Sequence, residues 1–138
     1  MEKCCYAAEL ENLVEVKQFV AAACNQDCAA DCLFDILLCV DEIFTNIVHY
    51  GGGHDVMVTV SVSCSEQNVT LQFDDSGVPF DPVNVVDPDL DIPFSNREPG
   101  GLGLFMVKQL ADDVVYTRFN GCNRLTISKN ICFAQGKR

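Results

Sequence analysis

Apolar residues recur with two different periods along the chain, and the change of period separates predicted helices from predicted strands. Over Ala8–Ala23 they return every three or four residues, which is typical of a helix with one buried face. The same spacing over Cys28–Tyr50 predicts a second helix, with Asp27 as its N-cap. We expect the glycines 51–53 to end that helix, and Lys3–Tyr6 to form a short edge strand ahead of the first one.

A two-residue alternation follows the glycines. The stretch "DVMVTVSVSC" (55–64) alternates valine with other residues, and "VTLQFDD" (69–75) resumes after a short turn, which predicts an antiparallel hairpin. A helix that opens at "GGLGLF" precedes two more predicted strands, 113–119 and 124–130, which are joined at "NGCN". This order of elements predicts an α/β two-layer sandwich, with helices on one face of a mixed, mostly antiparallel sheet.

A proline-rich stretch interrupts the second half of the chain. All 5 prolines lie between Ser76 and Pro99, together with several aspartates. Loops of this length in a compact domain are usually functional, so we expect a lid over about 79–100. No linker or change of composition divides the rest, and the sequence therefore predicts a single domain over 1–138.

Charge and composition narrow the classes of partner. The 9 basic and 20 acidic residues give a net charge of −11 without a basic cluster, which argues against nucleic acid. An anionic ligand would need backbone amides, the few cations or Mg²⁺. No apolar stretch is long enough to span a membrane, and acidic residues interrupt the N-terminus where a signal peptide would be apolar, so we expect a cytoplasmic protein. The 9 cysteines lack metal-site spacing and are expected to be reduced packing residues.

Three short motifs carry possible chemistry. In "DEIFTNIVHYGGG" the side chains of Glu42 and Asn46 share one helix face; a carboxylate can accept a proton, and an amide oxygen suits Mg²⁺. In "FDDSGVPFDP" a strand ends in Asp75-x-Gly77, which places a carboxylate at the sheet edge beside a glycine that can adopt positive φ. In "PGGLGLF" glycines precede a helix N-terminus, whose free N–H groups suit phosphate. Each motif alone is equally compatible with a polar stripe, a turn or a hinge.

Together and in this order, the motifs resemble the Bergerat ATP-binding fold of gyrase, heat-shock chaperone, histidine-kinase and mismatch-repair ATPases. The segments "DEIFTNIVHYG", "DDSGVPFDP" and "GGLGLFMVKQLADDV" are more closely similar to the small anti-sigma-factor serine/threonine kinases of bacteria. The resemblance extends from the first predicted helix to the last predicted strand. It implies ATP and Mg²⁺ as cofactors.

The resemblance also implies roles for individual residues. Asn46 would be the Mg²⁺ ligand, and Glu42 the general base toward a serine or threonine hydroxyl. Asp75 would bind the adenine amino group, and Gly77 would let the base approach. Phosphoryl transfer depends mainly on positioning and charge neutralisation, which agrees with this assignment.

Further residues follow from the resemblance less directly. Gly100, Gly101 and Gly103 would line the triphosphate, and Arg97 in the lid is the candidate for the γ-phosphate. Where related ATPases carry a Gly-Thr pair that supports the adenine, this chain reads "GCNR", so either Asn123 or Thr126 takes that place.

The family implies protein partners as well as a nucleotide. It predicts a kinase that phosphorylates a small antagonist protein and sequesters a partner such as a sigma factor, and that can form a homodimer. The alternative is a nucleotide-dependent protein-binding switch with little transferase activity. Both alternatives use the same pocket and differ in what Glu42 does.

Overall fold

Five strands form one open sheet in the order β1-β2-β3-β5-β4. The computed structural model describes residues 1–24, 30–52, 55–81 and 101–131. Every pairing between the described strands is antiparallel, whereas the sequence predicted a mixed, mostly antiparallel sheet. The strands are β1 (Glu2–Ala7), β2 (Met57–Cys64), β3 (Asn68–Asp75), β4 (Asp113–Phe119) and β5 (Cys122–Asn130).

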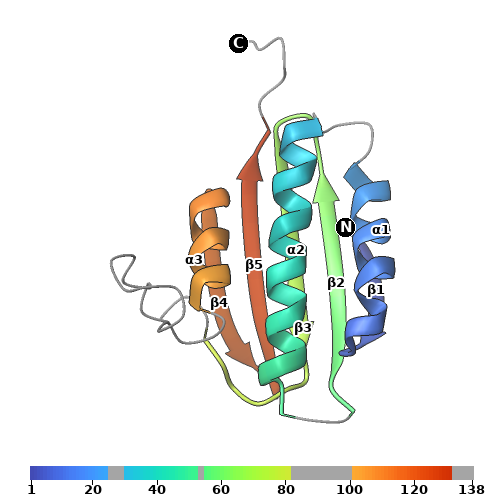
Figure 1. Cartoon of the computed structure of the whole chain (residues 1–138), viewed down its shortest axis with the longest axis vertical. Helices are drawn as coiled ribbons and strands as arrows, with labels where there is room; N and C mark the ends of the chain where they lie inside the picture. Colours follow the sequence, from blue (N-terminus) through green and yellow to red (C-terminus); the bar gives the residue numbers. More distant parts are fainter. Residues whose placement is uncertain (25–29, 53–54, 82–100, 132–138) are drawn as a thin grey trace.

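The helices cover one face of this sheet, with α2 in the middle, α1 beside it over β1 and β2, and α3 over β4 and β5 (Figure 1). Their bounds are η1 (Leu10–Asn12, a 3₁₀ turn), α1 (Leu13–Cys24), α2 (Ala30–Tyr50) and α3 (Gly101–Leu110). The predicted two-layer α/β sandwich is confirmed. Over the described part of the chain, the helices are too short or too polar to cross a membrane. The N-cap Asp27, the lid residue Arg97 and Gly100 lie outside the described residues.

The core lies between α2 and the sheet. Alternate residues of β2 and β3 point to the helices, as the period of a strand requires, while the helix contributes one apolar stripe. Phe44 and Phe73 are fully buried where the two layers meet. The buried apolar residues of α2 and of the two strands are Ile36, Cys39, Val40, Ile43, Phe44, Val58, Val60, Val62, Val69, Leu71 and Phe73.

The first predicted helix begins later than its apolar pattern indicates. Ala8 continues the sheet edge, where its N–H donates to Val56 O, and the Asn12 side chain donates to Ala7 O. These bonds compete with helical hydrogen bonding, so the chain makes a 3₁₀ turn before α1. Leu10, which the pattern places in the core, is half exposed as a result.

The hairpin of β4 and β5 turns on two residues with positive φ, Asn120 and Gly121. Asn-Gly favours this tight turn because both residues accept left-handed backbone, and it sets Phe119 opposite Cys122. Strand β5 therefore begins two residues before the predicted position. Asn123 consequently lies in the strand, directly opposite Asp75 of β3.

Seven cysteines lie in the described part of the chain, and none of these seven forms a disulfide bond. Cys24 and Cys39 are buried as predicted, and burial raises the pKa of the Cys39 thiol to about 11. Cys5 on β1 is exposed instead. In the same ranges, no group of three or more His, Cys, Asp or Glu residues is arranged to hold a metal ion.

Candidate functional site

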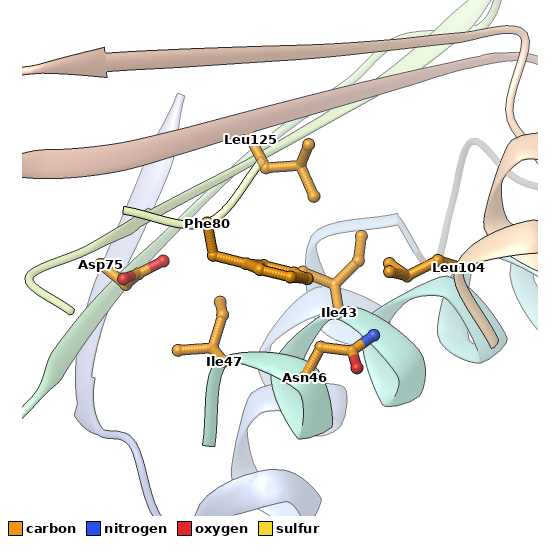
Figure 2. A pocket seen from close by; sticks show the side chains of 7 residues that line it. All are labelled: Ile43, Asn46, Ile47, Asp75, Phe80, Leu104 and Leu125. Atoms are coloured by element: carbon orange, nitrogen blue, oxygen red, sulfur yellow. The ribbon is translucent and has the colours of Figure 1, made fainter. Parts of the chain in front are cut away.

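A hollow opens at one end of the sandwich, where the second half of α2 approaches the end of β3, the first turns of α3 and the start of β5 (Figure 2). The space amounts to about 330 Å³ with its open mouth included. Mostly apolar walls with a few polar groups are typical of small-molecule sites. The lining residues are Ile43, Asn46, Ile47, Asp75, Phe80, Leu104 and Leu125.

Asn46 brings an unpaired polar group to this hollow. Its side chain lies beside Leu104 in Figure 2, and the residue is only 8% exposed. Among the described residues, nothing accepts a hydrogen bond from its buried Nδ2. Leaving such a group without a partner costs about 1–3 kcal/mol, which points to a missing ligand. Turning the amide over would present Oδ1 instead, the atom type that Mg²⁺ prefers.

Glu42 lies one helical turn before Asn46 but is not among the residues that line the hollow. Its carboxylate packs against Gly103 of α3, where a Cβ atom would collide with Oε2. Burial, and secondarily the charge of Asp41, raise the pKa of the Glu42 carboxyl. A raised pKa brings a carboxylate closer to the range in which general bases work.

The glycines of α3 therefore have different surroundings. Gly101 is the first residue of the helix, so its N–H belongs to the group without intrahelical partners. Gly103 has no room for a side chain because the Glu42 carboxylate lies there. Leu104 is the α3 residue that reaches the hollow itself.

Asp75 ends β3 and is 6% exposed. Its Oδ1 accepts hydrogen bonds from the Gly77 N–H at 2.9 Å and from Asn123 Nδ2 at 3.0 Å. Both bonds fall on Oδ1, so Oδ2 is the oxygen that they leave for a ligand. The preceding Asp74 points to the opposite face of the sheet, where Arg124 Nε and Nη2 donate to its two oxygens.

Gly77 joins this carboxylate to the end of α2. A Cβ atom at Gly77 would lie 2.6 Å from Gly51 O, so the close approach of the two segments requires glycine. The Val78 N–H donates to the same Gly51 O at 3.0 Å. The helix stop and the D-x-G turn thus pack on each other, and this contact sets the position of Asp75 relative to α2.

The two alternatives for the adenine-supporting residue separate in the structure. Asn123 is 5% exposed and bonds to Asp75. Thr126 is half buried and has the opposite parity in β5 from Leu125, which lines the hollow, so it lies on the other face of the sheet. The structure therefore brings Asn123 to the site and leaves Thr126 away from it.

Four other residues belong to the site although the sequence predicted no role for them. The Phe80 ring lies across the middle of the hollow in Figure 2 and stacks on Tyr50 with 5.3 Å between the ring centroids. The Tyr116 hydroxyl donates to Asn123 Oδ1, and Arg118 Nη1 donates to Gly77 O at 2.8 Å. Aromatic and cationic residues are common on strands, so nothing in the sequence assigned Tyr116 and Arg118 to the site. Phe80 lies in the segment "PFDP", which is part of the family resemblance and could have indicated it.

This arrangement favours a flat, amine-bearing ligand. The isoleucines of α2 and Leu125 offer apolar walls, while Asp75 offers an acceptor at one side. Asn46 supplies a second polar group closer to α3, whose N-terminal N–H groups favour anions. A planar base at Asp75 with phosphates toward α3 would fit this distribution of groups once the Phe80 ring, which lies across the hollow, turns aside.

Comparison with known proteins agrees with the geometry. Residues 6–129 match the model of the histidine kinase-like ATPase domain. A serine/threonine-protein kinase, BtrW of Bordetella bronchiseptica, is 29% identical over 99 residues, covering 70% of each chain. A serine-protein kinase, RsbW of Bacillus cereus, is 29% identical over 113 residues, covering 78% of this chain and 71% of the relative.

A solved structure shares the fold. The crystal structure of the RsbU and RsbW domains of a Mycobacterium tuberculosis protein superposes with a TM-score of 0.59. The match covers 94% of this chain but only 32% of the longer one, at 15% sequence identity. At that identity the likeness concerns the fold alone.

Proposed function

Because this chain belongs to the histidine kinase-like ATPase domain family, we propose that it binds ATP in the hollow of Figure 2 and phosphorylates a serine or threonine of a small protein. The observation that carries the proposal is the unpaired, buried Asn46 amide in the same hollow as the Asp75 carboxylate. Burying the Asn46 Nδ2 without a hydrogen-bond partner is costly unless a ligand bonds to this amide.

In this proposal Asp75 holds the base. Its Oδ2 accepts a hydrogen bond from the exocyclic amine of adenine, while Ile43, Ile47 and Leu125 contact the ring. Gly77 keeps the turn close to α2, so that the carboxylate stays at the edge of the hollow. The base is thus read by one directional bond and held by apolar contact.

Asn46 holds the metal end. Its amide oxygen would bind Mg²⁺, which when bound supplies positive charge beside the phosphates in a chain of net charge −11. The N–H groups at the start of α3, including that of Gly101, face the same anionic groups. Gly100 and Arg97, which lie outside the described residues, stay predictions for the triphosphate and the γ-phosphate.

Glu42 accepts the proton of the attacking hydroxyl. The hydroxyl oxygen forms a bond to the γ-phosphorus, the bond from that phosphorus to the bridging oxygen breaks, and ADP leaves. Its raised pKa and its place one turn from Asn46 support this role. Its carboxylate has to turn from Gly103 toward the hollow, a movement of a flexible side chain.

The packing of Glu42 on Gly103 also favours the second candidate function, a nucleotide-dependent switch with little transferase activity. In that case ATP controls the binding of a partner, and no antagonist is phosphorylated. Sequestration of a sigma factor and pairing of two copies are further parts of the proposal that rest on the resemblance.

Transfer of labelled phosphate separates these functions. Wild-type protein and the Glu42→Gln variant are incubated with γ-labelled ATP and Mg²⁺ in an extract of the native cells. The kinase function predicts label on serine or threonine of a small protein with the wild type and its loss with the variant, at unchanged ATP affinity. Retention of partners that depends on ATP, with no label on any protein, would favour the switch.

A further inference from the structure

Asn123 uses its whole hydrogen-bonding capacity inside the protein. Its Nδ2 donates to Asp75 Oδ1 at 3.0 Å and to Val78 O at 2.8 Å. Its Oδ1 accepts from the Tyr116 hydroxyl and from the Phe80 N–H at 3.3 Å. An amide side chain has two donors and two acceptor positions, and all four are occupied here.

This saturation leaves the Asn123 amide no free position for a hydrogen bond to a ligand. We propose that Asn123 is a positioning residue, which fixes the Asp75 carboxylate and the turn 77–80 as one unit and so makes the pocket select an amine-bearing purine. The inference rests on the proposed nucleotide site and deepens it. Two of the residues that bond to Asn123, Asp75 and Phe80, line the hollow, and Asn123 acts through them.

The backbone places Asn123 for this task. It lies directly opposite Asp75 in the ladder of β3 and β5, and the two-residue turn at Asn120 and Gly121 sets that register. Neighbouring residues opposite each other in antiparallel strands have side chains close enough to bond. The contact is therefore built into the sheet and does not depend on a loop.

The Phe80 N–H, which can only donate, fixes which way the amide faces. Because a hydroxyl and the Phe80 N–H both donate to Oδ1, the NH₂ group is directed at Asp75 and Val78 O. The reversed amide would set two acceptor oxygens, those of Asn123 and Asp75, against each other. Asp75 is consequently held with Oδ1 occupied by N–H groups and Oδ2 turned to the ligand.

Selection follows from this orientation. Adenine presents an amine donor at the purine 6-position, whereas guanine presents a carbonyl oxygen there, which would face the acceptor oxygen of Asp75. A fixed carboxylate rejects the carbonyl, while a carboxylate that is free to rotate can turn away from it. Asn123 thus governs discrimination between bases more than attraction for phosphates.

The test measures dissociation constants of ATP, GTP and purine riboside triphosphate, which lacks the amine, by calorimetry with Mg²⁺. Asn123→Ala should weaken ATP binding about tenfold, the order expected for one or two lost hydrogen bonds. It should strengthen GTP binding, because the freed carboxylate can turn away from the guanine carbonyl, and leave purine riboside triphosphate unchanged. Asn123→Thr, whose hydroxyl can still donate to Asp75, should recover most of the ATP preference. Thr126→Val, in the same strand on the opposite face, is the matched control and should behave as wild type.

A second arm keeps the test informative if Asn123→Ala folds poorly. Tyr116→Phe removes one bond to Asn123 and should lower the ratio of ATP to GTP affinity by a smaller factor in the same direction. Adding Tyr116→Phe to Asp75→Ala should change nothing further, because both act through one contact.

Two outcomes would overturn the inference. An unchanged ATP preference in Asn123→Ala would do so, as would equal weakening of all three nucleotides in that variant. If the wild type binds ATP and Asp75→Ala abolishes its preference, these outcomes defeat the role of Asn123 alone. If the wild type binds no nucleotide, the proposed function itself fails.

Discussion

Asp74 and Asp75 are consecutive residues at the end of β3, yet their carboxylates lie on opposite faces of the sheet. Asp74 accepts from Arg124 at 2.7 and 2.9 Å on the face away from the helices, and the Arg124 guanidinium lies 4.5 Å from the Phe119 ring centroid. Asp75 is buried toward α2 and lines the hollow. The same substitution, aspartate to asparagine, should therefore affect ATP binding at Asp75 but not at Asp74.

Asp75→Asn should weaken ATP binding by about 1–3 kcal/mol, because an amide N–H₂ at the position of Oδ2 meets the adenine amine donor to donor. Its remaining oxygen can still accept from Gly77 and Asn123, so the fold should persist. Asp74→Asn should bind ATP as wild type and lose about 1 kcal/mol or less of stability from a partly exposed ion pair. Calorimetry and thermal unfolding of both variants check this, and equal ATP affinities would contradict the role of Asp75.

Glu42 gives a pH dependence with a defined sign. Its pKa is raised in the folded chain, so phosphoryl transfer should fall as the pH drops through that raised pKa and the base takes up a proton. The charged form carries a burial penalty, so stability due to this group falls as the pH rises from the unfolded to the folded pKa. Glu42→Gln should therefore be at least as stable as wild type at neutral pH.

Rates of phosphate transfer between pH 5 and 8, with thermal unfolding at each pH, check this prediction. The Glu42→Gln variant serves as the control for changes in the substrate protein. A transfer rate that does not vary with pH, or a variant that keeps the wild-type rate, would contradict Glu42 as the base.

At the scale of elements, α2 contacts α3 where the Glu42 carboxylate packs on Gly103. In Gly103→Ala the new Cβ would displace the end of the Glu42 side chain, which is flexible and can move at little cost. Alanine also favours the helix by about 1 kcal/mol over glycine, so stability should change little. The rate of transfer should rise, because the carboxylate is displaced from residue 103 and can turn toward the hollow.

A double-mutant cycle checks this prediction. Gly103→Ala added to Glu42→Gln should not change the transfer rate of the Glu42→Gln variant, because the effect of Gly103→Ala depends on the Glu42 carboxylate. A wild-type rate in the single Gly103→Ala variant would show that the position of Glu42 does not matter.

Most elements could be predicted because each follows one clear rhythm. The valine alternation of β2 and β3 and the apolar stripe of α2 are unambiguous, and the predicted ranges agree with the structure to within a few residues. The errors fall where side-chain bonds compete with the pattern. Asn12 delays α1, and the Asn120–Gly121 turn starts β5 early.

The site was predictable in part, because sequence motifs mark some of its residues. Asp75 and Asn46 lie in motifs of a known family, and the structure brings both to one hollow. The sequence left Asn123 and Thr126 as alternatives, because the choice depends on strand parity and hence on where β5 begins. Tyr116 and Arg118 contact the site from another strand, and no local pattern indicates such long-range contacts.

At the scale of the whole molecule, one end of a two-layer sandwich gathers groups from α2, β3, α3 and β5 around one hollow. Apolar walls, one acceptor and one unpaired amide occur together there. The chain carries 20 acidic residues against 9 basic ones, so a nucleotide triphosphate would need neutralisation from a metal ion. Dependence on Mg²⁺ is therefore the property of the whole protein that the account requires.

Calorimetric titration of ATP into wild type and Asn46→Ala, each with Mg²⁺ and with EDTA, tests this most directly. The account predicts that Mg²⁺ strengthens ATP binding to the wild type and has little effect on the variant. The free variant should be as stable as wild type, because it loses a buried amide without a partner. Equal dependence on Mg²⁺ in both proteins, or no ATP binding by the wild type, would contradict it.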